Sequence, residues 1–185
     1  MRYAANLISA SRLALTPVCA LLASADTAGT RLAAIAVAVA VGLSDFVDGP
    51  LARRSGSASP FGALLDMTSD KVFMCTMLIV LAAAGRSPAW AAWLITSREL
   101  LVLFLRVVAS SRGRPMPIAL FGKLKTFMLY LLIPLALTGV TRAAVVFLAA
   151  AASLSALGSL VEYAVKMRGE LTSEFLSEDS PWNTL

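Results

Sequence analysis

Four aspartates at helical spacing are the residues of this sequence best suited to chemistry. Asp45 and Asp48 are three residues apart, and Asp66 and Asp70 are four apart. In a helix, these spacings place the members of each pair on one face. Two carboxylates about 4 Å apart repel each other by about 4 kcal/mol at an effective dielectric of 20. A cluster of four therefore needs counter-charge, unless the aspartates are simply solvated at the edge of a membrane.

Divalent cations would supply this counter-charge better than the nearby basic residues Arg53, Arg54 and Lys71. Ligand sets made of oxygen atoms suit Mg²⁺ or Mn²⁺, and two such ions neutralise four carboxylates. Two-metal sites stabilise the attacking and leaving oxygens of a phosphoryl displacement. The chain has no histidine, so any acid–base or metal chemistry depends on its carboxylates.

The composition places the aspartates in a membrane protein. Of 185 residues, 58% are hydrophobic and 15% are charged, which excludes a disordered chain and argues against an ordinary soluble domain. We expect an all-α integral membrane domain over residues 1–168 and a polar, acidic tail over residues 169–185. A membrane-spanning helix needs about 20 apolar residues. Six such helices are predicted, at residues 5–24, 30–52, 61–84, 88–110, 119–138 and 142–165.

The lysines and arginines predict how the six helices are oriented. With the N-terminus in the cytoplasm, ten of them lie on the inner side and three on the outer side, which favours cytoplasmic termini and a cytoplasmic aspartate cluster. The net charge of +5 then reflects loops that face anionic lipid and not nucleic-acid binding. The inner set is Arg2, Arg53, Arg54, Lys71, Arg112, Arg114, Lys123, Lys125, Lys166 and Arg168. The outer set is Arg31, Arg86 and Arg142.

The aspartates belong to a longer pattern, D-x2-D-G-x2-A-R-x8-G-x3-D-x3-D, which resembles the signature of the CDP-alcohol phosphotransferases. Its eight defined positions all match, at Asp45, Asp48, Gly49, Ala52, Arg53, Gly62, Asp66 and Asp70. The six-helix layout with a cytoplasmic site is also similar to that family, so the likeness covers most of the chain apart from the tail. Pro50 is unusual within the motif because proline removes a backbone donor, but it occupies a variable position.

The resemblance implies a metal-dependent enzyme that transfers a phosphatidyl group from a CDP-linked lipid to an alcohol and releases CMP. Asp70 would be the general base for the attacking hydroxyl, and Arg53 would face the diphosphate, which suits its forked donors. The ligands of two Mg²⁺ or Mn²⁺ ions would be Asp45, Asp48, Asp66 and Asp70. The residues around CDP would be Asp45, Gly49, Ala52, Arg53, Gly62 and Asp66. A homodimer in a bacterial-type inner membrane is also implied.

Other stretches resemble the phosphatidylglycerophosphate synthases within this family. They include the opening N-L-I-S-A-S-R-L-A-L-T-P, the T-S-R-E-L-L-V-L-F-L-R that starts at Thr96, and the G-K-L-K-T that starts at Gly122. The likeness implies CDP-diacylglycerol as donor and glycerol 3-phosphate as acceptor. For Lys123 and Lys125 we favour binding of the acceptor phosphate because the local motif matches. Arg106 and Arg112 are further candidates, and for Arg112 a role limited to the positive-inside rule is an equal alternative.

Two other functions stay open. Within the family, the acceptor could be inositol phosphate, or phosphatidylglycerol in a cardiolipin-forming reaction. Outside the family, the aspartates could line the mouth of a small cation channel or transporter, although a pore would distribute its acids along a path through the bilayer. Metal-dependent release of CMP from a CDP-lipid separates the enzyme from the channel.

Two further features have structural interpretations. Arg98 and Glu99 are predicted to lie deep within the fourth helix, where charged side chains pair or line a polar cavity. We expect them to form an ion network with Arg12 that holds the first and fourth helices together, in preference to a catalytic role. Cys19 and Cys75 lie in apolar runs without a C-x-x-C neighbour, so we expect free thiols and no disulfide.

Overall fold

The computed structural model describes residues 2–25, 27–54, 60–111, 119–139 and 141–175. Within these ranges, the side chains of residues 2–8, 45–54, 60, 61, 63, 64, 108, 110, 111 and 166–175 are outside the described part. The described chain forms six helices and no strand, which confirms the all-α prediction. The helices are α1 (Arg2–Ser24), α2 (Ala28–Arg54), α3 (Pro60–Ala83), α4 (Ala89–Ser111), α5 (Leu120–Thr138) and α6 (Arg142–Phe175).

One helix differs clearly from its predicted range. α6 continues to Phe175, ten residues past the predicted end at 165. The prediction stopped where the apolar stretch stops, whereas the helix extends through the charged sequence K-M-R-G-E-L-T-S-E-F. Lysine, arginine, glutamate and leucine are all good helix formers. The first residues of the segment that we expected to be a polar, acidic tail, residues 169–175, are therefore helical.

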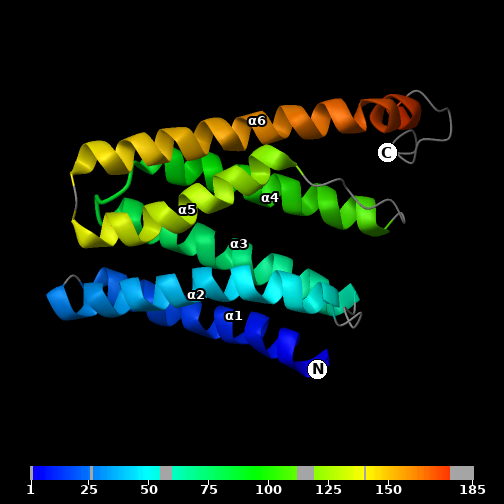
Figure 1. Ribbon diagram of the computed structural model, residues 1–185. Helices are drawn as coiled ribbons and strands as arrows, with labels where there is room; N and C mark the ends of the chain where they lie inside the picture. Colours follow the sequence, from blue (N-terminus) through cyan, green and yellow to red (C-terminus); the bar gives the residue numbers. More distant parts are fainter. Residues whose placement is uncertain (1, 26, 55–59, 112–118, 140, 176–185) are drawn as a thin grey trace, which may run out of the picture.

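The helices lie side by side as an elongated bundle (Figure 1). α3 packs against α1, α4 and α5, while α6 packs against α4 and α5, and α2 packs against α1 and α5. The starts of α1, α3 and α5 and the ends of α2, α4 and α6 lie at the same end of the bundle (Figure 1). We call this the site end because the aspartate motif crosses the α2–α3 connection there.

Small residues allow the helices to approach closely. Ala149, Ala152 and Ala156 are buried on one face of α6, and Ala34 and Ala38 are buried on one face of α2. Backbones that meet at alanine gain van der Waals contact without bulky side chains between them. This agrees with the close packing expected of alanine-rich helices in a membrane. The two cysteines are both free thiols, as predicted.

The two ends of α5 are fixed by different devices. At its last turn, Gly139 adopts a left-handed conformation with φ +75°, which glycine tolerates without steric cost. At its first turn, the Glu162 carboxylate of α6 accepts hydrogen bonds from the backbone N–H groups of Leu120 at 3.2 Å and Phe121 at 3.3 Å. An anion at this position satisfies unpaired donors and interacts favourably with the helix dipole. Glu162 thus fixes the start of α5 against α6.

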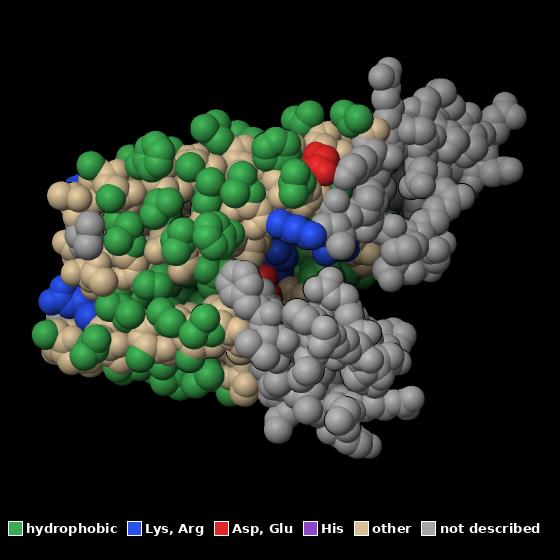
Figure 2. Space-filling model, in the orientation of Figure 1, with side chains coloured by type: hydrophobic (Ala, Val, Ile, Leu, Met, Phe, Trp, Pro, Cys, Tyr) green, Lys and Arg blue, Asp and Glu red, His purple; other side chains and the backbone are tan. Residues whose placement is uncertain are grey.

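The outer surface of the bundle is apolar. Hydrophobic side chains spread over the face shown in Figure 2, and the exposed fraction reaches 72% for Leu21 and 74% for Trp93. Monomeric soluble proteins rarely expose such large apolar areas, so this surface suits a lipid environment. By length and composition, two helices in the described part could cross a membrane, at Leu120–Thr138 and Arg142–Val165. The apolar parts of α1 and α2 are shorter, at Ser9–Ser24 and Ala28–Ser44.

Candidate active site

The second half of the aspartate motif lies on α3 at the site end. Asp66 and Asp70 are one turn apart, and Gly62 lies one turn before Asp66 in the same helix. The Asp66 side chain is 55% exposed, whereas Asp70 is partly buried. Asp66 is therefore open to solvent, and Asp70 is only partly covered.

The first half of the motif lies on α2. The backbone of α2 is helical through Asp45 and Asp48 and up to Arg54, so the two halves of the motif reach the same end of the bundle. The motif side chains outside the described residues are those of Asp45, Asp48, Gly49, Ala52 and Arg53. Among the described residues, no group of three or more histidine, cysteine or acidic side chains comes together as a metal site.

Arg12 of α1 contacts the motif from the side. Its Nη1 lies 3.5 Å from Asp66 Oδ1, and its Nη2 donates to Ser44 Oγ at 3.2 Å. Ser9 Oγ donates to the same Asp66 oxygen at 3.1 Å. Arg12 is only 2% exposed, and a buried cation is costly unless it is paired. Helix α1 therefore brings a fixed positive charge to the carboxylates of α3.

Arg12 therefore corrects one of the expectations from the sequence. We expected it to join Arg98 and Glu99 and to hold α1 against α4. The structure places it against Asp66 and Ser44, because α1 packs on α2 and α3. The partner of Arg12 depends on which helices are neighbours, and its charge alone did not reveal that partner.

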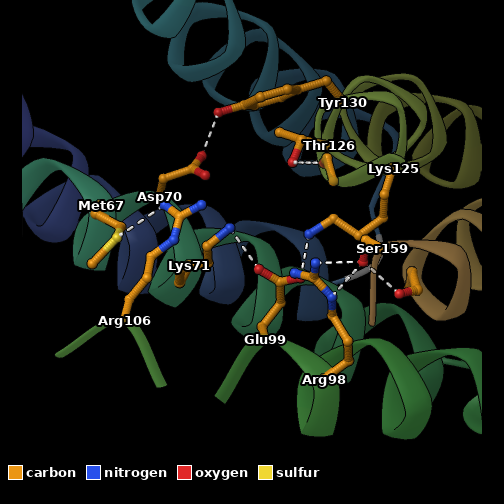
Figure 3. A network of polar contacts seen from close by, with 12 residues as sticks. Met67, Asp70, Lys71, Arg98, Glu99, Arg106, Lys125, Thr126, Tyr130 and Ser159 are labelled. Carbon is orange, nitrogen blue, oxygen red and sulfur yellow. Dashed lines mark hydrogen bonds and ion pairs between the residues drawn. The ribbon is translucent and has the colours of Figure 1, made fainter. Parts of the chain in front are cut away.

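Glu99 of α4 is a buried carboxylate surrounded by three cations (Figure 3). Its side chain is 1% exposed. Its Oε2 lies 2.5 Å from Lys71 Nζ, and its Oε1 accepts a hydrogen bond from Arg98 Nη1 at 2.8 Å. Lys125 Nζ also donates to Oε1. The expected pairing of Arg98 with Glu99 is confirmed, while the lysines of α3 and α5 were not foreseen as partners. We call these four residues the Glu99 cluster.

Uncharged groups of α6 complete the surroundings of the arginines. Arg98 Nε donates to Ser159 Oγ at 3.0 Å, and its guanidinium lies 5.8 Å from the centre of the Tyr163 ring. Arg106 Nη2 donates to Tyr163 Oη at 2.9 Å, and Arg106 Nη1 approaches Met67 Sδ at 3.4 Å. Arg106 has no carboxylate partner among the described residues, and its buried Nε has no hydrogen-bond partner there. Its charge is thus available to an anion.

The residues that we predicted to bind the acceptor phosphate differ in their burial and in their partners. Lys125 is buried against Glu99, and Lys123 is exposed on the first turn of α5. Arg106 is partly buried and contacts Met67 and Tyr163 (Figure 3). Arg112 lies outside the described residues. The Glu99 cluster holds three cations and one carboxylate, an excess of two positive charges. Such an excess of one sign of charge attracts anions, and Lys71, with 20% of its side chain exposed, is its most accessible cation.

Asp70 has a partner that the sequence did not reveal. The hydroxyl of Tyr130 on α5 donates to Asp70 Oδ1 at 2.7 Å (Figure 3). Ser9, Ser44 and Tyr163 were missed in the same way. Their one signal was a polar group within an otherwise apolar helix, which is too common to single out any of them.

Comparisons with known proteins place these residues in context. A family model described as CDP-alcohol phosphatidyltransferase matches residues 2–157. A probable phosphatidylglycerophosphate synthase of Mycobacterium tuberculosis H37Rv is 35% identical over 168 residues, which cover 88% of this chain and 80% of the relative. The CDP-diacylglycerol–glycerol-3-phosphate 3-phosphatidyltransferase of Bacillus subtilis is 31% identical over 66% of this chain and 69% of its own length. A CMP-forming cardiolipin synthase of Streptomyces coelicolor is 32% identical over 71% of this chain and 63% of its own length.

The Glu99 cluster makes a prediction about stability. Glu99→Gln leaves two buried cations, Arg98 and Lys125, and the partly buried Lys71 without their shared counter-charge, so we expect a loss of about 3–5 kcal/mol of unfolding free energy. Adding Lys125→Met removes one of these cations and restores part of the loss. The measurement is reversible unfolding of the purified protein in detergent.

Glu162→Gln is the matched control for this experiment. It is the same chemical change at a helix cap near the surface, where we expect a loss of about 1 kcal/mol or less. Equal losses for Glu99→Gln and Glu162→Gln would contradict the view that Glu99 is the counter-charge of the buried cluster.

Proposed function

Because this chain belongs to the CDP-alcohol phosphatidyltransferase family, we propose that it transfers the phosphatidyl group of CDP-diacylglycerol to glycerol 3-phosphate. The products are phosphatidylglycerophosphate and CMP, as the names of the relatives in Mycobacterium tuberculosis and Bacillus subtilis suggest. The observation that carries the choice of acceptor is the cation excess of the Glu99 cluster, which lies beside Asp70.

In this reaction, the acceptor hydroxyl oxygen bonds to the phosphorus that carries diacylglycerol, and the bond from that phosphorus to the CMP oxygen breaks. The hydroxyl proton passes to the Asp70 carboxylate, which acts as general base. Asp70 is only partly buried, so an acceptor could reach it from the site end. The residues proposed to hold CDP are Asp45, Gly49, Ala52, Arg53, Gly62 and Asp66.

We propose that Asp45, Asp48, Asp66 and Asp70 hold two Mg²⁺ or Mn²⁺ ions. The described part of this donor set fits such ions, since Asp66 and Asp70 offer carboxylate oxygens one helical turn apart and Asp66 is open to solvent. When bound, the ions would stabilise negative charge on the transferring phosphate. Arg12 and Ser9 hold Asp66 Oδ1 in place from α1, which orients that carboxylate.

The charge of the acceptor favours glycerol 3-phosphate over phosphatidylglycerol. The phosphate of glycerol 3-phosphate is a dianion near neutral pH, and it matches the two excess positive charges of the Glu99 cluster. Arg106 adds a cation without a carboxylate partner in the described part of the chain. Phosphatidylglycerol carries a single charge, yet the Streptomyces coelicolor cardiolipin synthase is a relative, so cardiolipin formation is the second candidate. Inositol phosphate, also a dianion, is a third acceptor to test.

A panel of acceptors tests the proposed reaction. Purified protein with CDP-diacylglycerol and Mg²⁺ should release CMP with glycerol 3-phosphate, and far less with phosphatidylglycerol, inositol phosphate or serine. A chelator should abolish the release, and added Mg²⁺ or Mn²⁺ should restore it. Asp48→Asn keeps the shape and removes a charge, so its rate should fall by orders of magnitude. Normal turnover of Asp48→Asn, or activity that survives chelation, would contradict the metal assignment.

The proposed acceptor site predicts that substitutions in it change the KM for glycerol 3-phosphate and not the KM for CDP-diacylglycerol. Arg106→Gln and Lys123→Ala should each raise the KM for glycerol 3-phosphate, because a lost charge-assisted hydrogen bond costs about 1.5–3 kcal/mol, or roughly 10- to 150-fold. The KM for CDP-diacylglycerol should change little. Lys125 is a poorer probe because it also contacts Glu99. Arg142→Gln, at the opposite end of the bundle, is the control and should match the wild type. Equal loss of affinity for both substrates would count against a separate acceptor site.

The topology is part of the proposal. The family and its bacterial relatives support a membrane location, and the distribution of basic residues favours cytoplasmic termini and a cytoplasmic site end. A reporter fused after Leu185 should therefore respond as cytoplasmic, and one inserted near Ala28 as external. The reverse pattern would contradict the orientation. The homodimer that the family resemblance implies also stays a prediction.

A further inference from the structure

We propose that Tyr130 is a positioning residue for Asp70 in the transfer reaction. Its hydroxyl holds one oxygen of the carboxylate, and its ring is held in turn by the backbone of α2 at Gly42. The proposal rests on the proposed function, because it assigns Tyr130 a role in the step where Asp70 takes the proton of the acceptor.

The first support is the contact with Asp70. The Tyr130 hydroxyl donates to Asp70 Oδ1 at 2.7 Å, and the two side chains point toward each other across the space between α5 and α3 (Figure 3). Hydrogen bonds from a hydroxyl to a carboxylate are among the strong ones. With Oδ1 held, the carboxylate loses rotational freedom, and Oδ2 takes a defined direction in which it can accept a proton from the acceptor.

The second support is the way in which the tyrosine ring is held. A Cβ atom built on Gly42 would lie 2.9 Å from Tyr130 Cδ1 and 3.3 Å from Cε1, so one side of the ring packs closely against α2 at Gly42. Only glycine allows this approach without a shift of the ring. Gly42 precedes Asp45 by three residues. Tyr130 thus contacts both α2, which carries the first half of the motif, and Asp70 of α3, which belongs to the second half.

A purely structural role is the alternative interpretation. The hydroxyl of a tyrosine inside an apolar helix bundle usually finds a hydrogen-bond partner, and Asp70 could simply be the nearest acceptor. Tyr130 is partly buried and packs against the hydrophobic core of the bundle, and a phenylalanine would keep this packing. The two roles therefore differ in what happens when the hydroxyl alone is removed.

Tyr130→Phe is the central variant. We expect its kcat with glycerol 3-phosphate to fall by about 10- to 100-fold, since a hydrogen bond to a charged group is lost. The KM values of both substrates should stay within about twofold, because the hydroxyl acts on the base and not on binding. The melting temperature in detergent should stay near that of the wild type. Steady-state kinetics with each substrate varied in turn give the three values.

Tyr163→Phe is the matched control. It deletes the same atom, but its hydroxyl accepts a hydrogen bond from Arg106, which belongs to the proposed acceptor site. We expect it to raise the KM for glycerol 3-phosphate and to affect kcat much less. The same chemical change should therefore lower kcat in Tyr130→Phe and raise the KM for glycerol 3-phosphate in Tyr163→Phe.

Gly42→Ala tests whether the ring has to be held. It keeps the hydroxyl and displaces the ring, so kcat should fall here too. In the double variant Tyr130→Phe/Gly42→Ala, the hydroxyl is already absent, and we expect no fall beyond that of Tyr130→Phe alone. Fully additive losses would mean that the two residues act independently, which would overturn the proposed link.

Other outcomes are equally decisive. A wild-type kcat for Tyr130→Phe would overturn the proposal, and so would a fall in kcat accompanied by equal rises in both KM values and a lower melting temperature. The proposed function is judged separately by the wild-type protein. If the wild type prefers another acceptor, the choice of glycerol 3-phosphate fails, and the ratio of Tyr130→Phe to wild type with that other acceptor still tests the positioning role.

Discussion

The arrangement of the bundle depends on one buried carboxylate. Glu99 lies among apolar helices, where an unpaired charge would cost several kcal/mol, and it is compensated by Arg98 of its own helix and by lysines from α3 and α5. Through Arg98, the same group of contacts reaches Ser159 of α6. Four helices are thereby held in one relative position, and Lys71 in the middle of α3 and Lys125 near the start of α5 meet at the same carboxylate.

This constraint divides the site end into an acidic side and a basic side. Asp70 and Lys71 are neighbours in the sequence, yet Asp70 receives a hydrogen bond from Tyr130 while Lys71 points to Glu99. The acidic side suits cations and the basic side suits a phosphate. The proposed transfer to an anionic acceptor would need both environments within a short distance, because the carboxylates proposed to bind metal and the proposed acceptor site would have to meet at one phosphorus atom.

Much could be predicted from the sequence because its signals are local. Helical spacing places Asp66 and Asp70 on one face of a single helix, whatever packs around it. The number of helices follows from apolar runs separated by turn residues, and all six were found. The end of α6 was missed because hydropathy measures where lipid contact stops, whereas the helix continues through charged residues that also favour helical structure.

What only the tertiary structure decided is which helices are neighbours. Arg12 and Glu99 looked like partners in the sequence because both are charges in apolar segments, but α1 packs on α2 and α3 and brings Arg12 to Asp66. In the same way, the contacts of Tyr130 with Gly42 of α2 and Asp70 of α3 became visible only in the packed bundle. The sequence by itself determined the aspartate motif, the helical class and the apolar surface, since each depends on residue types and on spacing along one helix. It could not determine the partners of the buried charges, because contacts between helices join residues that are distant in the chain and no local periodicity records them.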